Sequence, residues 1–234
     1  MEYFVTDQAV RIIGVLGFLF IAYSIFMGRM TAQGLPAGYS NPVLALELVK
    51  NGADIKQIVE AESGKAAKFI RRNTYKDFGF IIVYAVFFIA VSLLLSQMYP
   101  GRARCVAWFA AGCATLAAIL DVAEDRGMLK ALGGEFTDSL ADSIRYPSLA
   151  KWSLLFVFSL LVGLLLIARR DIFAIPAVLF FVATLLGMIG VLWNFFRPKY
   201  YWTFPVALLS MGFAIIFLAI TFTFWPARFL DKLP

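Results

Sequence analysis

Long apolar runs without a single charged residue recur six times along the chain. Each run, with its flanks, approaches the roughly 20 residues that a helix needs to cross about 30 Å of hydrocarbon. An Asp, Lys or Arg at the centre of such a helix would cost about 2.5–3.5 kcal/mol on insertion. The pattern therefore predicts an all-α polytopic transmembrane helical bundle, with spans at about 10–28, 77–97, 104–122, 151–168, 172–193 and 203–225.

A transmembrane β-barrel would instead alternate apolar and polar residues along its strands. Segment 160–167 reads Leu-Leu-Val-Gly-Leu-Leu-Leu-Ile, which has no such alternation. The chain of 234 residues is 62% hydrophobic and 15% charged, whereas a soluble domain is about half apolar and a quarter charged. We therefore expect a single transmembrane domain, 1–234.

The stretch between the first two spans carries helix signals of its own. Pro42 follows Asn41, Asp54 precedes an apolar stripe that includes Ile55 and Ile58, and Gly64 interrupts the pattern. These signals predict short helices at about 42–51, 54–62 and 65–76, with Asp54 capping the second. We interpret them as an interfacial collar with apolar faces in the headgroup layer. A docking platform for a partner is the alternative.

The basic residues are distributed unevenly between the loops, and the net charge is +6. With the N-terminus outside the cytoplasm, the cytoplasmic loops hold 14 Lys and Arg residues and the opposite side holds 7. The positive-inside rule then places both termini outside, in a cell (inner or plasma) membrane. Because these cations flank the spans, we expect membrane lipids and other membrane-protein subunits as partners, and no nucleic acid.

Histidine is absent from the chain, and the two cysteines are Cys105 and Cys113. The lack of histidine argues against His-ligated haem, most zinc proteases and Ser–His hydrolases. Eight helical residues separate the cysteines by about 12 Å, too far for a disulfide. We expect no cofactor, no metal site and no catalytic residue.

Polar residues gather at the predicted cytoplasmic ends of spans 2, 3 and 4. If these spans are neighbours, Asp77, Asp121 and Lys151 lie at one membrane depth and can form an Asp–Lys–Asp arrangement. We consider three interpretations: interfacial charges that reach water, a structural ion pair, and a site for a headgroup, cation or proton. The candidate polar cluster is Asp77, Tyr84, Asp121, Glu124, Asp125, Arg145 and Lys151.

Segment 121–125 also resembles, superficially, the aspartate-rich motifs that hold Mg²⁺-diphosphate in prenyl-transferring enzymes. Such enzymes need a second acidic cluster facing the first. The candidates for it are Glu135, Asp138 and Asp142, which we place in the same polar loop.

Two further patterns concern the helix surfaces. Small residues let helices approach closely in lipid, so we expect the stripes Ala107–Ala111–Ala114–Ala118 and Ala183–Gly187 to pack inside the bundle, with a homodimer seam as the alternative.

Aromatic and basic residues before span 6 predict a belt at headgroup level, with stacking on a pigment, quinone or sterol as the alternative. The belt comprises Trp193, Arg197, Lys199, Tyr200, Tyr201 and Trp202.

The segments 76–84, 121–125 and 151–152 together are similar to a group of uncharacterised bacterial multi-pass membrane proteins. Those proteins have an Asp-Phe-x-Phe…Tyr segment opening one span, an Asp-x-x-Glu-Asn segment closing the next, and a Lys-Trp or Lys-Phe pair opening a third. This chain has Asp125 in place of the Asn. The resemblance covers about residues 42–168 and implies that Asp77, Asp121, Glu124 and Lys151 act together. It implies no reaction.

The sequence thus predicts a non-catalytic integral membrane protein, a lipid- or partner-binding accessory subunit of a membrane complex. A small transporter or channel that uses Asp77, Asp121 and Lys151 is the first alternative. An Mg-dependent lipid-modifying enzyme that uses Asp121 and Asp125 is the second.

Overall fold

The computed structural model describes residues 6–28, 30–36, 39–168, 172–196 and 203–227. These residues form helices and connections without any β-strand, and six of the helices are long and apolar enough to cross a membrane, as predicted. The elements are α1 (Asp7–Met27), α2 (Pro42–Glu47), α3 (Gly52–Glu60), the 3-10 helix η2 (Ala61–Gly64), α4 (Lys65–Met98), α5 (Arg102–Ala131), α6 (Asp138–Ile167), α7 (Ala174–Phe196) and α8 (Thr203–Phe224).

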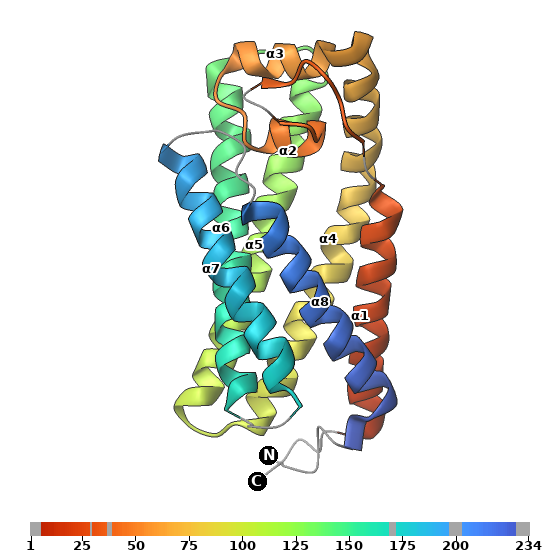
Figure 1. Ribbon diagram of the computed structural model, residues 1–234, viewed down its shortest axis with the longest axis vertical. Coiled ribbons are helices and arrows are strands. Elements are labelled where there is room, and N and C mark those ends of the chain that lie inside the picture. The colour runs from red at the N-terminus through yellow and green to blue at the C-terminus, as the bar shows by residue number, and fades with distance from the viewer. Residues whose placement is uncertain (1–5, 29, 37–38, 169–171, 197–202, 228–234) are drawn as a thin grey trace.

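The six long helices form a closed ring in chain order. Each packs against the next, and α8 returns to pack against α1. As Figure 1 shows, α1 begins and α8 ends at one end of the bundle, while α2 and α3 cover the other end. Helices α4, α5 and α6 extend furthest toward α2 and α3. The bundle is therefore closed around its axis and capped at one end by α2 and α3.

Polar side chains define the ends of the short helices. The Asn41 side chain accepts hydrogen bonds from the first turn of α2, and the Asn51 side chain accepts one from the backbone of Asp54 at 2.8 Å. Asn51, rather than Asp54, is therefore the cap of α3, because Asp54 already lies inside its first turn. Gly64, at φ 80°, ends the interruption before α4, as the sequence predicts.

The interpretation of α2 and α3 as a lipid-facing collar is wrong. Their apolar residues Leu46, Ile55 and Ile58 are fully buried and belong to a core shared with Met128 of α5 and Ile144 of α6. Burial of each such side chain contributes about 1.5–3 kcal/mol whether the apolar neighbour is protein or lipid. The two helices thus form a cap on the bundle.

The predicted loop between spans 3 and 4 is largely helical. Helix α5 continues to Ala131 and α6 begins at Asp138, so both run well past the predicted span limits. Pro147 lies inside α6, and a turn containing Gly134, at φ 100°, joins the helices. The Asp138 carboxylate accepts a hydrogen bond from the Gly52 backbone at 2.8 Å, which ties α6 to α3.

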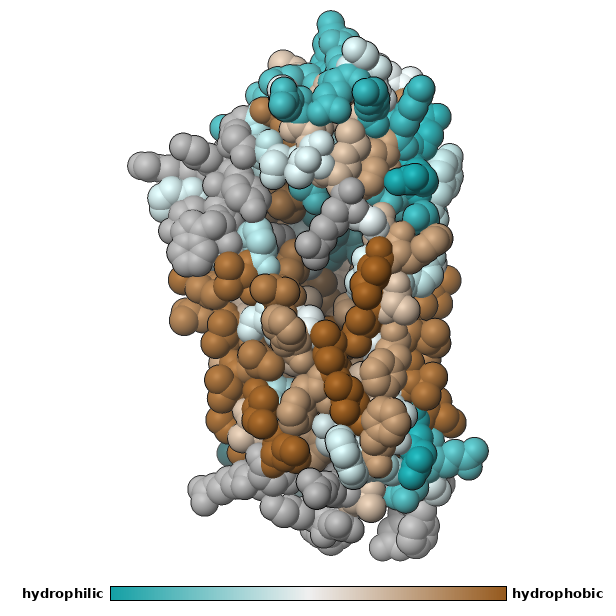
Figure 2. Space-filling model, turned by 45° about the vertical axis from the view of Figure 1, so that its right-hand side comes forward, coloured by the Kyte–Doolittle hydropathy of each residue, from teal (hydrophilic) through white to brown (hydrophobic). Residues whose placement is uncertain are grey.

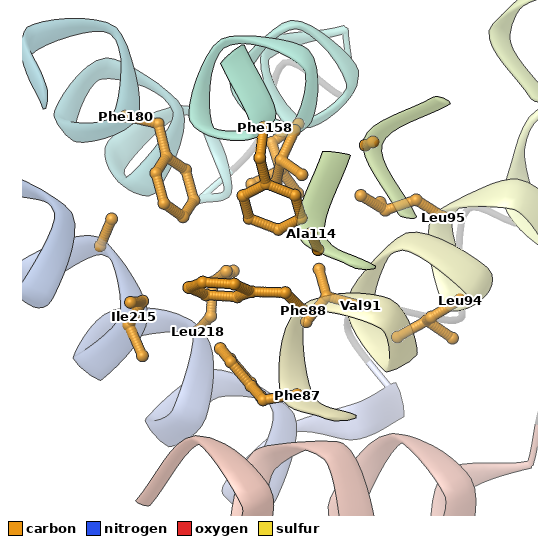
Figure 3. Close-up of a cluster of buried hydrophobic side chains, with 14 of the residues drawn as sticks. Phe87, Phe88, Val91, Leu94, Leu95, Ala114, Phe158, Phe180, Ile215 and Leu218 are labelled. Atoms are coloured by element: carbon orange, nitrogen blue, oxygen red, sulfur yellow. The ribbon is translucent and has the colours of Figure 1, made fainter. Parts of the chain in front are cut away.

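Close aromatic packing fills the centre of the ring. The rings of Phe88 of α4 and Phe158 of α6 are in contact in a tilted arrangement, with centroids 4.5 Å apart (Figure 3). Most of the small-residue stripes packs inside the bundle as expected, because Ala107, Ala114 and Ala183 are fully buried. Ala118 differs, since it is only partly buried and lines a groove between α4 and α5. A Cβ atom at Gly187 would overlap the ring of Phe156, so this close approach requires glycine.

The outer surface divides into zones along the bundle axis. On the face that Figure 2 shows, a broad apolar band crosses the bundle, with hydrophilic residues concentrated at the capped end and a smaller group at the other end. Large apolar side chains of the long helices, such as Ile82, Ile119 and Leu185, are more than half exposed. Lipid can contact such a surface without cost, which fits a multi-pass membrane protein.

Candidate functional site

Lys151 is the centre of a buried ionic cluster between α4, α5 and α6. Its Nζ atom lies 2.7 Å from Asp121 Oδ1 and 2.7 Å from Glu124 Oε2. The Tyr84 hydroxyl donates a 2.9 Å hydrogen bond to the other oxygen of Asp121. Lys151 is 3% exposed, Asp121 4% and Glu124 1%. The lysine charge is therefore neutralised inside the protein.

Helix geometry explains why these side chains meet. Asp121 and Glu124 are three residues apart on α5, so both project from one face toward α6. Counted from Arg102 at the far end of α5, Asp121 lies about 28 Å along the helix axis. Counted from Ile167, Lys151 lies about 24 Å along α6. The cluster thus lies near one edge of a hydrocarbon layer about 30 Å thick.

Glu47 of α2 joins the cluster from the cap. Its carboxylate accepts a 3.1 Å hydrogen bond from the indole of Trp152, and the Lys151 ammonium lies 5.0 Å from the centroid of that ring. Burial raises the pKa of Glu47, and the nearby Lys151 opposes that shift. Sequence reasoning missed Glu47. The available signal was a single carboxylate in the otherwise apolar segment Pro42–Val49.

Asp77 and Asp125 border the cluster but do not bind the lysine. Asp77 is half-buried and lies within electrostatic range of Asp121 and Lys151, yet within the described residues it forms no salt bridge. The expected Asp77–Lys151–Asp121 arrangement is replaced by Asp121–Lys151–Glu124. Asp125 is 1% exposed, and its Oδ2 atom has no hydrogen-bond partner among the described residues.

Arg145 lies apart from this cluster. Its guanidinium donates to the backbone carbonyls of Asn194 (2.7 Å) and Phe195 (3.0 Å) at the end of α7. The Tyr39 hydroxyl donates to the Asn194 side chain at 3.0 Å, and burial raises the pKa of Tyr39. A cation at the C-terminal end of a helix satisfies free carbonyls and the helix dipole. Arg145 therefore fastens α6 to α7.

The predicted aromatic belt is only partly within the described residues. Trp193 is on α7 and is 39% exposed. Arg197, Lys199, Tyr200, Tyr201 and Trp202 lie outside the described residues.

The acidic side chains are not arranged as a metal site. Throughout the described ranges, no group of three or more Cys, Asp and Glu side chains is placed to hold a metal ion. Asp121 and Glu124 are both directed at Lys151, and Asp138 binds the α3 backbone. The described residues therefore provide no set of Mg²⁺ ligands for the alternative of an Mg-dependent lipid-modifying enzyme.

A groove of about 570 Å³ lies between α4 and α5, separate from the buried cluster. Its volume is within the range of roughly 300–1,000 Å³ that is typical of small-molecule sites. The side chains that line it are apolar except at its ends, where Thr115 and Arg126 lie. The lining consists of Ile81, Ile82, Ala85, Val86, Ile89, Thr115, Ala118, Ile119, Val122, Ala123 and Arg126.

Comparison of the chain with protein-family models, curated proteins and solved structures finds no match. The resemblance to uncharacterised bacterial membrane proteins therefore stays a prediction.

Proposed function

We propose that this chain is a non-catalytic integral membrane protein that binds lipid, as an accessory subunit of a membrane assembly. The observation that carries this proposal is the apolar groove between α4 and α5. It opens in the wall that faces lipid, and Ile82 and Ile119 on its rim are 65% and 60% exposed. A groove in that position holds an acyl chain more readily than a polar substrate, because its lining offers few hydrogen-bonding groups.

The buried cluster supports a non-catalytic role. Lys151 already has two carboxylates at 2.7 Å, and Asp121 also accepts the Tyr84 hydroxyl. Groups that satisfy one another in this way hold α4, α5 and α6 in register. Removing one partner of such a buried pair costs about 3–5 kcal/mol. We interpret the cluster as a structural ion pair that locks the bundle.

Native mass spectrometry of the protein extracted in a mild detergent tests this proposal. We expect one or two lipid molecules, or a lipid together with another membrane subunit, to remain bound at collision energies that strip detergent. A chain that loses all lipid at the same energy as detergent would contradict the proposal. Thr115→Phe, which fills the groove, should lower lipid retention, whereas Leu116→Phe on the neighbouring exposed face should not.

Ion or proton transport is the second candidate function, and one observation favours it. Four buried carboxyl groups lie within electrostatic range of the buried Lys151: Asp121 and Glu124 contact it, and Glu47 and Asp125 lie nearby. Like charges this close in a low dielectric cannot all ionise, so the cluster has capacity for a proton or a cation.

Flux measurements in proteoliposomes separate the two functions. Transport predicts that the wild-type protein carries protons or monovalent cations and that Asp121→Asn abolishes this flux. Asp142→Asn, an exposed carboxylate on the same helical hairpin, is the matched control. Wild-type vesicles that leak no faster than protein-free vesicles would exclude this candidate and leave the lipid-binding proposal in place.

A further inference from the structure

The charges on the last turns of α5 are sorted by sign. The acidic residues Asp121, Glu124 and Asp125 are all buried toward the bundle interior, whereas Arg126 and Lys130 are exposed. Arg126 forms no hydrogen bond or salt bridge with any described residue. The outward face of this helix end therefore presents only positive charge, although the segment as a whole is acidic.

This positive face continues the floor of the groove. Ile119, Ala123, Arg126 and Lys130 follow one another at spacings of three or four residues, so they share one face of α5. The groove runs about 16 Å along α5, from Thr115 to Arg126, and about 12 Å along α4, from Ile81 to Ile89. An apolar channel thus leads directly to an unpaired guanidinium.

The depth of the groove matches one leaflet of a bilayer. Counted from Arg102, Thr115 lies about 20 Å and Arg126 about 36 Å along α5. The hydrocarbon layer is about 30 Å thick, with headgroups extending the bilayer to about 40–45 Å. The apolar part of the groove therefore lies in the hydrocarbon of one leaflet, and Arg126 lies at the level of that leaflet's phosphates.

From this geometry we propose that the groove binds an anionic glycerophospholipid, with one acyl chain between α4 and α5 and the phosphate on Arg126. Arg126 supplies a planar donor array suited to phosphate oxygens, and Lys130 adds a second cation one turn away. The absence of exposed carboxylate on this stretch of α5 favours an anionic headgroup over a zwitterionic one. The inference rests on the proposed lipid binding and specifies its ligand and its site.

The experiment uses the full-length protein in nanodiscs made from phosphatidylcholine with phosphatidylglycerol of the same acyl chains. Lipids retained after release into detergent are quantified by native mass spectrometry. We expect phosphatidylglycerol to be enriched on the wild-type protein. A contribution of about 1 kcal/mol from one interfacial cation corresponds to about fivefold enrichment, which Arg126→Gln should remove.

Matched variants locate the effect. Arg72→Gln removes an exposed arginine from α4 at the same end of the bundle and should retain the enrichment of phosphatidylglycerol. Arg126→Lys preserves the charge and should retain most of this enrichment. Thr115→Phe should reduce retention of both lipids, and Leu116→Phe should not.

The possible outcomes distinguish a failure of this inference from a failure of the lipid-binding proposal on which it rests. Enrichment that is lost in Arg126→Gln alone supports the site. Equal losses in Arg126→Gln and Arg72→Gln would overturn it in favour of diffuse attraction. Retention of lipid without any headgroup preference would overturn the inference and leave lipid binding standing. A wild-type protein that retains no lipid would overturn both.

Discussion

Replacing Lys151 with Met would remove the cation from the buried cluster and leave its carboxylates in place. Methionine has a similar length and packs well in apolar surroundings, so the change in volume is small. The two carboxylates at 2.7 Å, Asp121 and Glu124, would then face each other without a counter-charge. Breaking a buried ion pair in this way costs about 3–5 kcal/mol. For a chain of this size, that loss corresponds to a fall of roughly 6–20 °C in Tm.

Thermal unfolding in dodecyl maltoside, followed by tryptophan fluorescence, measures this loss. Lys68→Met is the matched control, because Lys68 is exposed on α4 and surface substitutions change stability by about 0.5 kcal/mol or less. A triple variant that combines Lys151→Met with Asp121→Asn and Glu124→Gln replaces the charges with neutral groups of similar shape. It should recover part of the lost stability, because it removes the uncompensated buried charges but leaves polar amides in their place.

Two results would refute this reasoning. The first is a Tm for Lys151→Met that lies within 1 °C or so of the Lys68→Met value, which would mean that the pair is not desolvated. The second is a triple variant as unstable as Lys151→Met alone, which would mean that packing around the lysine stem, rather than charge balance, stabilises the site.

Three further predictions concern single side chains. Tyr84→Phe removes the hydrogen bond to Asp121 and should lower the unfolding free energy by about 0.5–1.5 kcal/mol in the same thermal assay; an unchanged Tm would contradict this. Because burial raises the pKa of Glu47, protonated Glu47 stabilises the fold below the ordinary pKa of 4.5, and this stabilisation declines as the pH rises. Above pH 4.5 the Tm of the Glu47→Gln variant should therefore fall less steeply with pH than the Tm of the wild-type protein. Gly187→Val would overlap the ring of Phe156 and should destabilise the bundle by about 1–3 kcal/mol, whereas Gly112→Val, in open space on α5, should have a much smaller effect.

The sequence was sufficient to predict the six long helices of the described residues and the burial of most small residues in the two stripes. Uncharged runs of this length have few alternatives, and small residues at helical spacing indicate close contact. The meeting of Asp121 with Lys151 was also predictable, because consecutive spans are usually neighbours. These features depend on local pattern and chain order alone.

Other features of the fold and of the buried cluster could not be predicted from the sequence pattern. The stripe containing Ile55 and Ile58 is equally compatible with lipid and with protein, so the cap over the bundle and the contribution of Glu47 were missed. Charged residues after Asp121 resembled a loop, although α5 continues as a helix to Ala131 and buries Glu124 and Asp125. Arg145 is six residues from Lys151, which places the two about 120° apart around α6. That angle alone predicts that the two side chains do not share one site.

The ion pair between Lys151 and Asp121 has a consequence for how the protein enters the membrane. Both acidic partners precede the lysine by about 30 residues or fewer, on the adjoining arm of one hairpin. During synthesis, the carboxylates are therefore already present when the ammonium group leaves the ribosome. We expect the two arms to partition from the translocon together as a charge-compensated unit, so that neither helix has to enter lipid with a bare ion. Helices α7 and α8 would then join a hairpin in which Lys151 already has its two carboxylate partners.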